Sequence, residues 1–144
     1  MGIENSLAVY ALSRPGAATA SRLASSLQDI RESGPELAGG EQGTLTRQVH
    51  LYLPGALARG FGATGFSSLK GLLPKIFSAY SGHVMVTAAG IAVRCISPLL
   101  LGKNRDPAVV VLDQQGEYAV SLLSGHLGGG NRLAREVAEV LGGR

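Results

Sequence analysis

The fold is decided by residues 108–120, Ala108-Val-Val-Val-Leu-Asp-Gln-Gln-Gly-Glu-Tyr-Ala-Val120. Residues 108–112 are all apolar, which is typical of a strand that is buried on both faces of a sheet. Asp113 and Gly116 occupy the first and last positions of a predicted β-turn, and residues 117–120 then return as an antiparallel strand. A strand buried on both faces needs helices on each side of its sheet, so this stretch predicts an α/β fold.

Three more apolar runs predict strands at residues 7–12, 49–53 and 83–88. Between them and after them, apolar residues recur at helical spacing over residues 17–27, 69–80, 91–98 and 132–141. Pro15 suits the start of the first helix, whereas Pro74 predicts that the second helix kinks or begins near Leu73. We therefore expect one α/β domain over residues 1–144. Its predicted architecture is a three-layer α/β/α sandwich with a mostly parallel sheet of about five strands, one of them a hairpin strand.

Two segments have no such periodicity. Residues 32–48 are polar and rich in glycine, which predicts a flexible surface loop. Gly60, Gly62 and Gly65 predict an irregular connection before the second helix.

The composition excludes several classes of protein. Thirteen Lys and Arg against ten Asp and Glu give a net charge of +3, which is too weak to indicate a nucleic-acid partner but suits a small anionic ligand. A single cysteine, Cys95, excludes a disulfide framework and is expected in the core. The residues that precede the first strand do not resemble a signal peptide, and no apolar run reaches the roughly 18 residues of a membrane span. We expect a cytoplasmic protein with no membrane partner.

Residues 124–131, Ser-Gly-His-Leu-Gly-Gly-Gly-Asn, are the strongest functional signal in the chain. Glycines between a strand and a helix let backbone N–H groups approach an anion at the helix N-terminus. The spacing matches neither a dinucleotide fingerprint nor a P-loop. The candidate binding residues are Ser124, Gly125, Gly128, Gly129, Gly130 and Asn131. The alternative is a tight turn that needs glycine only for its backbone conformation.

His126 lies inside this segment and is the candidate general base, because an imidazole titrates near neutral pH. Its alternative is a hydrogen bond that orders the turn. Asp113 and Glu117 are candidate carboxylates for orienting it. We expect the other histidines, His50 and His83, to be surface or edge residues at strand starts.

Two further segments carry candidate ligand-binding groups. Gly90 and Arg94 belong to the short helix after the third strand, and an arginine there could clamp a carboxylate. Lys103 and Arg105 lie in a charged turn and could supplement it. For each basic residue the alternative is a solvated side chain. Since ligands of parallel sheets bind at the carboxyl ends of the strands, we expect residues 89–90, 103–107 and 125–131 to meet at that edge.

Four motifs, at residues 88–94, 103–109, 113–116 and 121–131, together resemble the N-terminal domain of the CbiG family. That family comprises cobalt-precorrin-5A hydrolases of the anaerobic cobalamin pathway. The resemblance extends from Phe66 to Leu141 and is looser over residues 1–31. It implies an α/β sandwich fold and a cobalt-bearing corrinoid substrate whose δ-lactone is opened by water with release of acetaldehyde. The family's C-terminal domain is absent from these 144 residues.

The resemblance also implies roles for the candidate residues. His126 would activate water, the N–H groups of residues 128–130 would hold the oxyanion, and the basic groups would meet the substrate's carboxylates. The protein needs no metal or cofactor of its own, since the cobalt belongs to the substrate, and other enzymes of the pathway are candidate partners. Two alternatives stay open: a non-catalytic corrinoid-binding domain that acts with a separate C-terminal domain or partner, and a phosphate-binding α/β domain.

Overall fold

The computed structural model describes residues 3–28, 31–36, 42–102, 104–123 and 129–143. Its main sheet has six strands in the order β5-β4-β1-β6-β7-β8. Their bounds are Ile3–Ala11 (β1), Gln48–Pro54 (β4), Thr64–Phe66 (β5), Tyr80–Val86 (β6), Ala108–Leu112 (β7) and Ala119–Leu123 (β8). All neighbouring pairs are parallel except β7 and β8, which are antiparallel. The predicted α/β class with a mostly parallel sheet and one hairpin strand is therefore confirmed, with six strands rather than about five.

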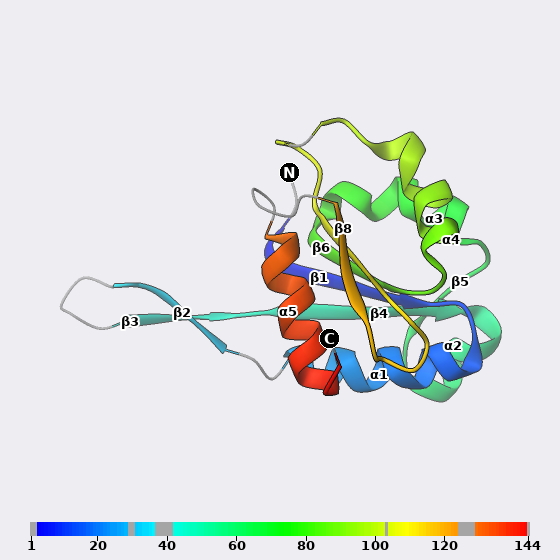
Figure 1. Cartoon of the computed structure of the whole chain (residues 1–144), viewed down its shortest axis with the longest axis horizontal. Helices are drawn as coiled ribbons and strands as arrows, with labels where there is room; N and C mark the ends of the chain where they lie inside the picture. Colours follow the sequence, from blue (N-terminus) through cyan, green and yellow to red (C-terminus); the bar gives the residue numbers. More distant parts are fainter. Residues whose placement is uncertain (1–2, 29–30, 37–41, 103, 124–128, 144) are drawn as a thin grey trace.

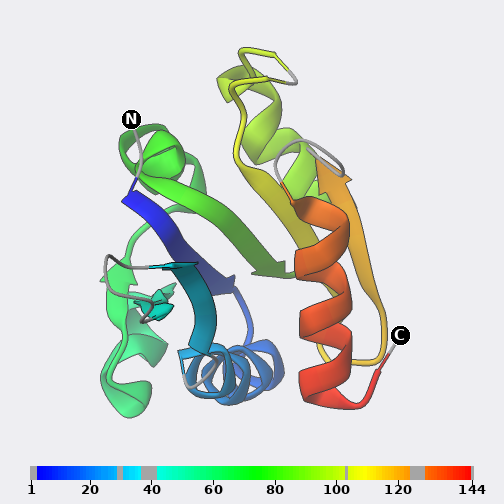
Figure 2. The ribbon, with the colours of Figure 1, turned by 90° about the vertical axis from the view of Figure 1, so that its left-hand side faces the viewer.

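Helices cover both faces of this sheet. Helices α1 (Arg14–Gln28), α2 (Gly55–Phe61) and α5 (Gly130–Leu141) lie on one face. Figure 2 shows α1 (blue) below the central strands and α5 (red) against β7 and β8. Helices α3 (Leu69–Ile76) and α4 (Ala89–Ile96) lie on the other face, each followed by a 3-10 turn, Phe77–Ala79 (η1) and Ser97–Leu99 (η2). The structure is the expected three-layer sandwich. None of the helices in the described part of the chain is long and apolar enough to cross a membrane.

Alternation along each central strand divides the core into two halves. In β1, Leu7, Val9 and Ala11 pack with α1 and α5, whereas Ala8 and Tyr10 pack with α3 and α4. Successive side chains of a strand point to opposite faces, and both faces of β1 are covered. This explains why residues 7–11 of β1 are apolar without interruption.

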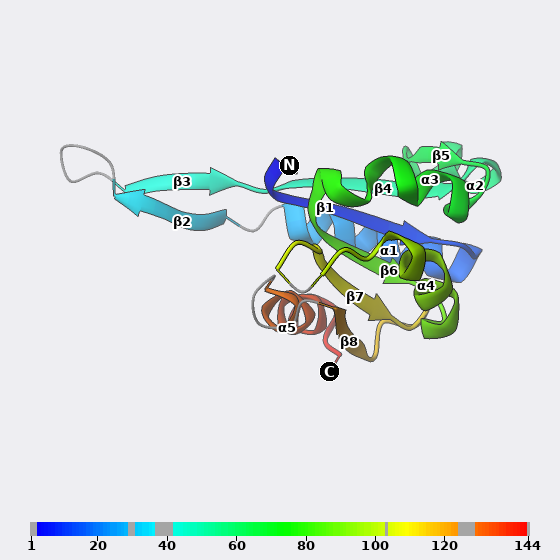
Figure 3. The same cartoon turned by 90° about the horizontal axis from the view of Figure 1, so that it is seen from above.

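The loop prediction for residues 32–48 is wrong over residues 32–36 and 42–48, and residues 37–41 lie outside the described residues. Residues Arg31–Glu36 (β2) and Gln42–Thr46 (β3) form an antiparallel hairpin that projects from the sandwich (Figures 1 and 3). At its base Arg47 is buried and forms an ion pair with Glu136 at 2.7 Å. The side-chain amide of Gln28 bonds both the carbonyl of Arg47 and the N–H of Val49. The two strands are joined by backbone pairing, and their sequence is polar with no apolar alternation. Hydrophobic periodicity therefore could not predict them.

The connection predicted as irregular contains α2 and β5, which is a second correction. Gly62 ends α2 in the left-handed conformation, with φ of 63°, where glycine is favoured. Helix α3 begins at Leu69, capped by Ser68, whose side chain accepts the N–H of Gly71 at 3.1 Å. The alternative start near Leu73 is therefore wrong, and Pro74 lies inside the helix. Tyr80 begins β6 instead of extending the helix.

Candidate functional site

The described parts of the three segments that were expected to converge lie at opposite ends of the parallel strands. These two ends are called here the carboxyl edge and the amino edge of the sheet. Residues 89–90 follow the carboxyl end of β6, where Val86 pairs with Leu112. Residues 104–107 precede the amino end of β7, and Leu123 at the end of β8 pairs with Val109 at that same end. Because β7 has five residues, the two edges are roughly 16 Å apart. Figure 3 shows the start of α4 and the start of α5 at opposite ends of the molecule.

The packing of α5 supports the same assignment. A Cβ built on Gly82, near the amino end of β6, would lie 3.1 Å from Cδ2 of Leu133 in the first turn of α5. The expectation of one shared site for residues 88–94 and 125–131 is therefore wrong. The physical reason is that β8 is antiparallel to β7, so it returns the chain to the amino edge before the glycine-rich segment begins.

The candidate residues are divided between these edges and the undescribed segments. Gly90 and Arg94 are exposed on α4, which runs back from the carboxyl edge. Gly129, in the left-handed conformation with φ of 78°, is the N-cap of α5 at the amino edge, next to buried Gly130 and half-buried Asn131. The remaining candidates lie outside the described residues: Lys103, Ser124, Gly125, His126 and Gly128. The ligand-binding and catalytic roles of all these residues stay predictions.

The amino edge also carries a turn organised by a buried carboxylate. Asp106 accepts the N–H groups of Leu101, at 2.8 Å, and Gly102, at 3.2 Å. The backbone N–H groups of Arg105 and Asp106 both bond the carbonyl of Gly102. This turn leaves Arg105 exposed, in agreement with either a solvated or a ligand-binding role.

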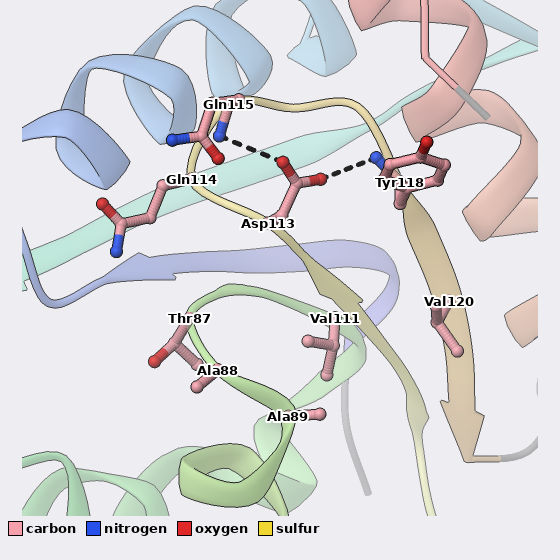
Figure 4. A pocket seen from close by; sticks show the side chains of 9 residues that line it. All are labelled: Thr87, Ala88, Ala89, Val111, Asp113, Gln114, Gln115, Tyr118 and Val120. Carbon is pink, nitrogen blue, oxygen red and sulfur yellow. Dashed lines mark hydrogen bonds between the residues drawn. The ribbon is translucent and has the colours of Figure 1, made fainter.

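The carboxyl edge contains a pocket of about 450 Å³ between the β6–α4 connection and the β7–β8 turn (Figure 4). The pocket is lined by Thr87, Ala88, Ala89, Val111, Asp113, Gln114, Gln115, Tyr118 and Val120. The strand order reverses between β1 and β6, and the pocket lies next to that point, where β6 and β7 end. Open α/β sheets bind ligands outside the carboxyl ends of their strands, so the pocket is the candidate site of the described structure.

The pocket combines an apolar surface with polar groups. Val111 and Val120 are paired across β7 and β8, and Val111 is buried whereas Val120 is 56% exposed. Gln114 and Gln115 extend from the turn above them, where Tyr118 also lies. Sequence reasoning missed these residues as site candidates. For Gln114 and Gln115 the available signal was their position in the motif at residues 113–116, directly after a buried strand.

Asp113 folds the turn that forms this wall. One of its carboxylate oxygens accepts the N–H groups of Glu117 and Tyr118, at 2.9 and 2.6 Å, and the other accepts the N–H of Gln115 at 3.2 Å. Asp113 and Glu117 lie at the carboxyl edge, whereas Leu123 and Gly129, which flank the segment with His126, lie at the amino edge. His126 itself lies outside the described residues, so the nomination of these carboxylates stays a prediction.

His83 is another correction, because it is fully buried rather than at a surface or an edge. Its Nε2 lies 2.8 Å from the carbonyl oxygen of Phe77, which can only accept, so Nε2 carries the hydrogen. In the neutral ring Nδ1 then accepts from the hydroxyl of Tyr10 at 2.7 Å. Burial lowers the pKa of His83 to about 4 and raises the pKa of Tyr10. His83 lies outside the pocket lining and holds η1 against the sheet.

The exposure of His50 and of Cys95 agrees with what the sequence predicted for each residue. His50 is exposed, as expected, and its Nδ1 lies 2.6 Å from the hydroxyl of Tyr80. Cys95 is buried in the half of the core beneath α4, so its prediction as a core residue is confirmed.

The model of the family described as "Cobalamin synthesis G N-terminal" matches residues 71–144. The chain belongs to this family. The matched segment runs from α3 to the end of the chain and includes every residue of the carboxyl-edge pocket. Membership confirms the resemblance to the CbiG N-terminal domain.

Two curated relatives are 50% identical to this chain over the residues that align. The cobalt-precorrin-5A hydrolase of Priestia megaterium is 50% identical over 74 residues, which is 51% of this chain and 20% of that protein. The enzyme of the same name from Salmonella typhimurium is 50% identical over 66 residues, 46% of this chain and 19% of that protein. The chain thus spans about a fifth of the length of these relatives.

A solved structure shares the fold over nearly the whole chain. The cobalamin biosynthesis protein G homolog from Sulfolobus solfataricus superposes with a TM-score of 0.70 at 20% identity. The match covers 99% of this chain and 36% of that one. At this identity the likeness concerns the fold alone.

Proposed function

We propose that this chain is part of a hydrolase that opens the δ-lactone of cobalt-precorrin-5A in cobalamin biosynthesis. The observation that carries the proposal is the 50% identity, over 74 residues, to a protein named cobalt-precorrin-5A hydrolase. The residues that match the family model, 71–144, include the carboxyl-edge pocket, where open α/β sheets bind their ligands. The activity is proposed rather than assigned because the chain spans only about a fifth of that relative.

The proposed reaction is an ester hydrolysis. The oxygen of water forms a bond to the lactone carbonyl carbon and the ring C–O bond breaks, which frees an acetate side chain and leaves a hydroxyl on the two-carbon fragment. That hydroxyl becomes the aldehyde C=O as the C–C bond to the macrocycle breaks. The electron pair of this bond stays on the macrocycle, which takes up the hydroxyl proton, and the fragment leaves as acetaldehyde. Such a reaction needs a base for the water proton and donors for the oxyanion. In the proposal His126 is the base and residues 128–130 supply N–H donors. Gly90 and Arg94 lie at the carboxyl edge and Gly129 at the amino edge, so the two sets do not act in one site. As an alternative to the amino-edge groups, Gly90 lets the backbone of α4 approach a substrate at the carboxyl-edge pocket, and Arg94 binds one of its carboxylates. The cobalt is part of the substrate.

A second function is favoured by one specific observation. Because about four fifths of each curated relative lies outside the match, the catalytic groups could belong to the remaining part. This domain would then hold the corrinoid while another domain or partner hydrolyses the lactone.

One experiment separates these functions. The purified chain is incubated with cobalt-precorrin-5A, and both bound corrinoid and released acetaldehyde are measured, with the Salmonella typhimurium hydrolase as the positive control for the substrate. Acetaldehyde release supports the hydrolase. Binding without acetaldehyde supports the corrinoid-binding domain. Binding of inorganic phosphate but not of the corrinoid would contradict both and support the third alternative.

The cytoplasmic location stays a prediction. Fractionation of cells that express the tagged natural protein tests it, and recovery with the membrane fraction would contradict it.

A further inference from the structure

We propose that Tyr118 is a specificity-determining residue whose ring packs against the flat macrocycle of the corrinoid at the mouth of the carboxyl-edge pocket. This inference rests on the proposed function for its ligand. It deepens that function, since neither the family match nor the named relatives assign a role to this position.

The first support is the exposure of the apolar groups around the pocket. Tyr118 is 52% exposed and Val120 is 56% exposed, and both line the same cavity as buried Val111. Large apolar side chains that stay in water beside a cavity indicate a surface that a ligand covers. A ring packed on a flat conjugated partner gains stacking energy in addition to the area that it buries.

The second support is that the wall carrying Tyr118 is formed before any ligand binds. The carboxylate of Asp113 holds the backbone N–H of Tyr118, and the N–H of Asp113 lies 3.4 Å from the carbonyl oxygen of Tyr118. From outside the turn, the hydroxyl of Thr19 on α1 donates to the carbonyl of Gln114 at 2.5 Å. A preformed wall binds without an added entropic cost of ordering.

The third support is the polar character of the rest of the lining. Gln114 and Gln115 bring amide groups to the pocket, which can donate to the carboxylates at the edge of a corrinoid. Asp113 is the lining residue with a charged side chain, and both of its oxygens already accept backbone N–H groups. At about 450 Å³ the pocket is smaller than a whole corrinoid. It therefore takes one edge of the ring, and Tyr118 supports the part outside.

The hydrogen bonds between Asp113 and Tyr118 use the backbone of Tyr118, so substitutions of its side chain leave them in place. Tyr118→Ala keeps the backbone hydrogen bonds to Asp113, and Tyr118→Phe keeps the ring but removes the hydroxyl. Leu101→Ala is the matched control, because Leu101 is a 74% exposed apolar residue at the opposite edge of the sheet.

The test titrates the parent chain and these variants with cobalt-precorrin-5A, followed by the absorption spectrum of the corrinoid, and records each melting temperature. We expect Tyr118→Ala to weaken binding roughly 3- to 10-fold. We expect Tyr118→Phe and Leu101→Ala to bind as the parent does. All melting temperatures should agree within a few degrees.

The outcomes separate this inference from the proposed function. Parent-like binding by Tyr118→Ala overturns the role of Tyr118 and leaves the function standing. Equal weakening by Tyr118→Ala and Leu101→Ala overturns it too. Removing an exposed apolar side chain would then weaken binding equally at the pocket and at the opposite edge of the sheet. A large fall in melting temperature in Tyr118→Ala identifies the ring as structural and overturns the inference. A parent chain that binds no corrinoid contradicts the proposed function itself.

Discussion

The hydroxyl of Tyr10 on β1 lies 2.7 Å from Nδ1 of His83 on β6, and both side chains are buried between the sheet and η1. Phe77 at the start of η1 stacks on the His83 ring with centroids 5.0 Å apart and accepts its Nε2 hydrogen. The pair thus joins two central strands to the helical layer above them. It also fixes the ring of His83 as neutral, with its hydrogen on Nε2.

This arrangement predicts a pH dependence of stability. The folded-state pKa of His83 is about 4, below its ordinary value of 6.5, so between these values the unfolded chain binds a proton that the folded chain does not. The stability that neutral His83 contributes is fully present above pH 6.5 and is lost as the pH falls toward 4. The total loss of unfolding free energy over this range is roughly 3 kcal/mol. Urea unfolding between pH 4.5 and 8 should show this decline.

His83→Leu is the matched variant for that measurement. It should be less stable than the parent at pH 8, because the Tyr10 hydroxyl loses its acceptor at a typical cost of about 1–3 kcal/mol. The difference between the two proteins should shrink as the pH is lowered. If both proteins lose stability equally between pH 6.5 and 4.5, His83 does not carry the pH dependence.

Gly116 should be intolerant of substitution, whereas Gly90 should not. Gly116 has a φ of 74°, and a Cβ there would lie 3.1 Å from Cδ1 of Leu141 and 3.3 Å from Cγ2 of Thr19. We expect Gly116→Ala to lower the free energy of unfolding by roughly 1–3 kcal/mol. A Cβ on Gly90 meets nothing within 4 Å, so Gly90→Ala should be neutral or stabilising. Chemical denaturation of both variants checks this, and equal destabilisation would contradict it.

Arg94 should matter for the ligand and not for the fold. It is exposed in the last turn of α4, where a cation interacts favourably with the helix dipole by only about 0.3–1 kcal/mol. In the proposed role Arg94→Ala should weaken corrinoid binding by roughly 10- to 100-fold, as expected for loss of a charge-assisted hydrogen bond. Spectroscopic titration and a melting curve are measured together. A variant that melts far below the parent while its binding is unchanged would identify Arg94 as structural.

His126 can be tested although it lies outside the described residues. If it is the general base, His126→Ala should slow acetaldehyde release roughly 10²- to 10⁴-fold in the catalytically competent protein. His126→Gln should be equally slow, since glutamine keeps a hydrogen-bonding side chain but cannot accept a proton near pH 7. Substrate binding should fall much less in both. Near-parent turnover by His126→Gln would assign the base to another group.

The sequence by itself determined the local elements of the main sheet. Predominantly apolar runs predicted β1, β4, β6 and β7, because helices cover both faces of the sheet. Asp113 and Gly116, at the first and last positions of four residues, predicted the β7–β8 turn. The Asp113 carboxylate accepts backbone N–H groups of the turn, and Gly116 adopts a positive φ of 74°. The family resemblance likewise rested on four local motifs and is confirmed over residues 71–144.

Only the tertiary structure decided which segments are neighbours in space. The antiparallel direction of β8 separates Gly129 from Gly90, and no local pattern distinguishes the two edges of a sheet. The β2–β3 hairpin and the short β5 depend on backbone pairing rather than on apolar burial, so periodicity did not predict them. His83 is a polar residue that is nevertheless buried, because both of its ring nitrogens have hydrogen-bond partners. These partners are Tyr10, 73 residues away in the sequence, and Phe77 on η1. Burial and pairing are properties of the packed chain, which is why Tyr118 became a candidate only once the pocket was visible.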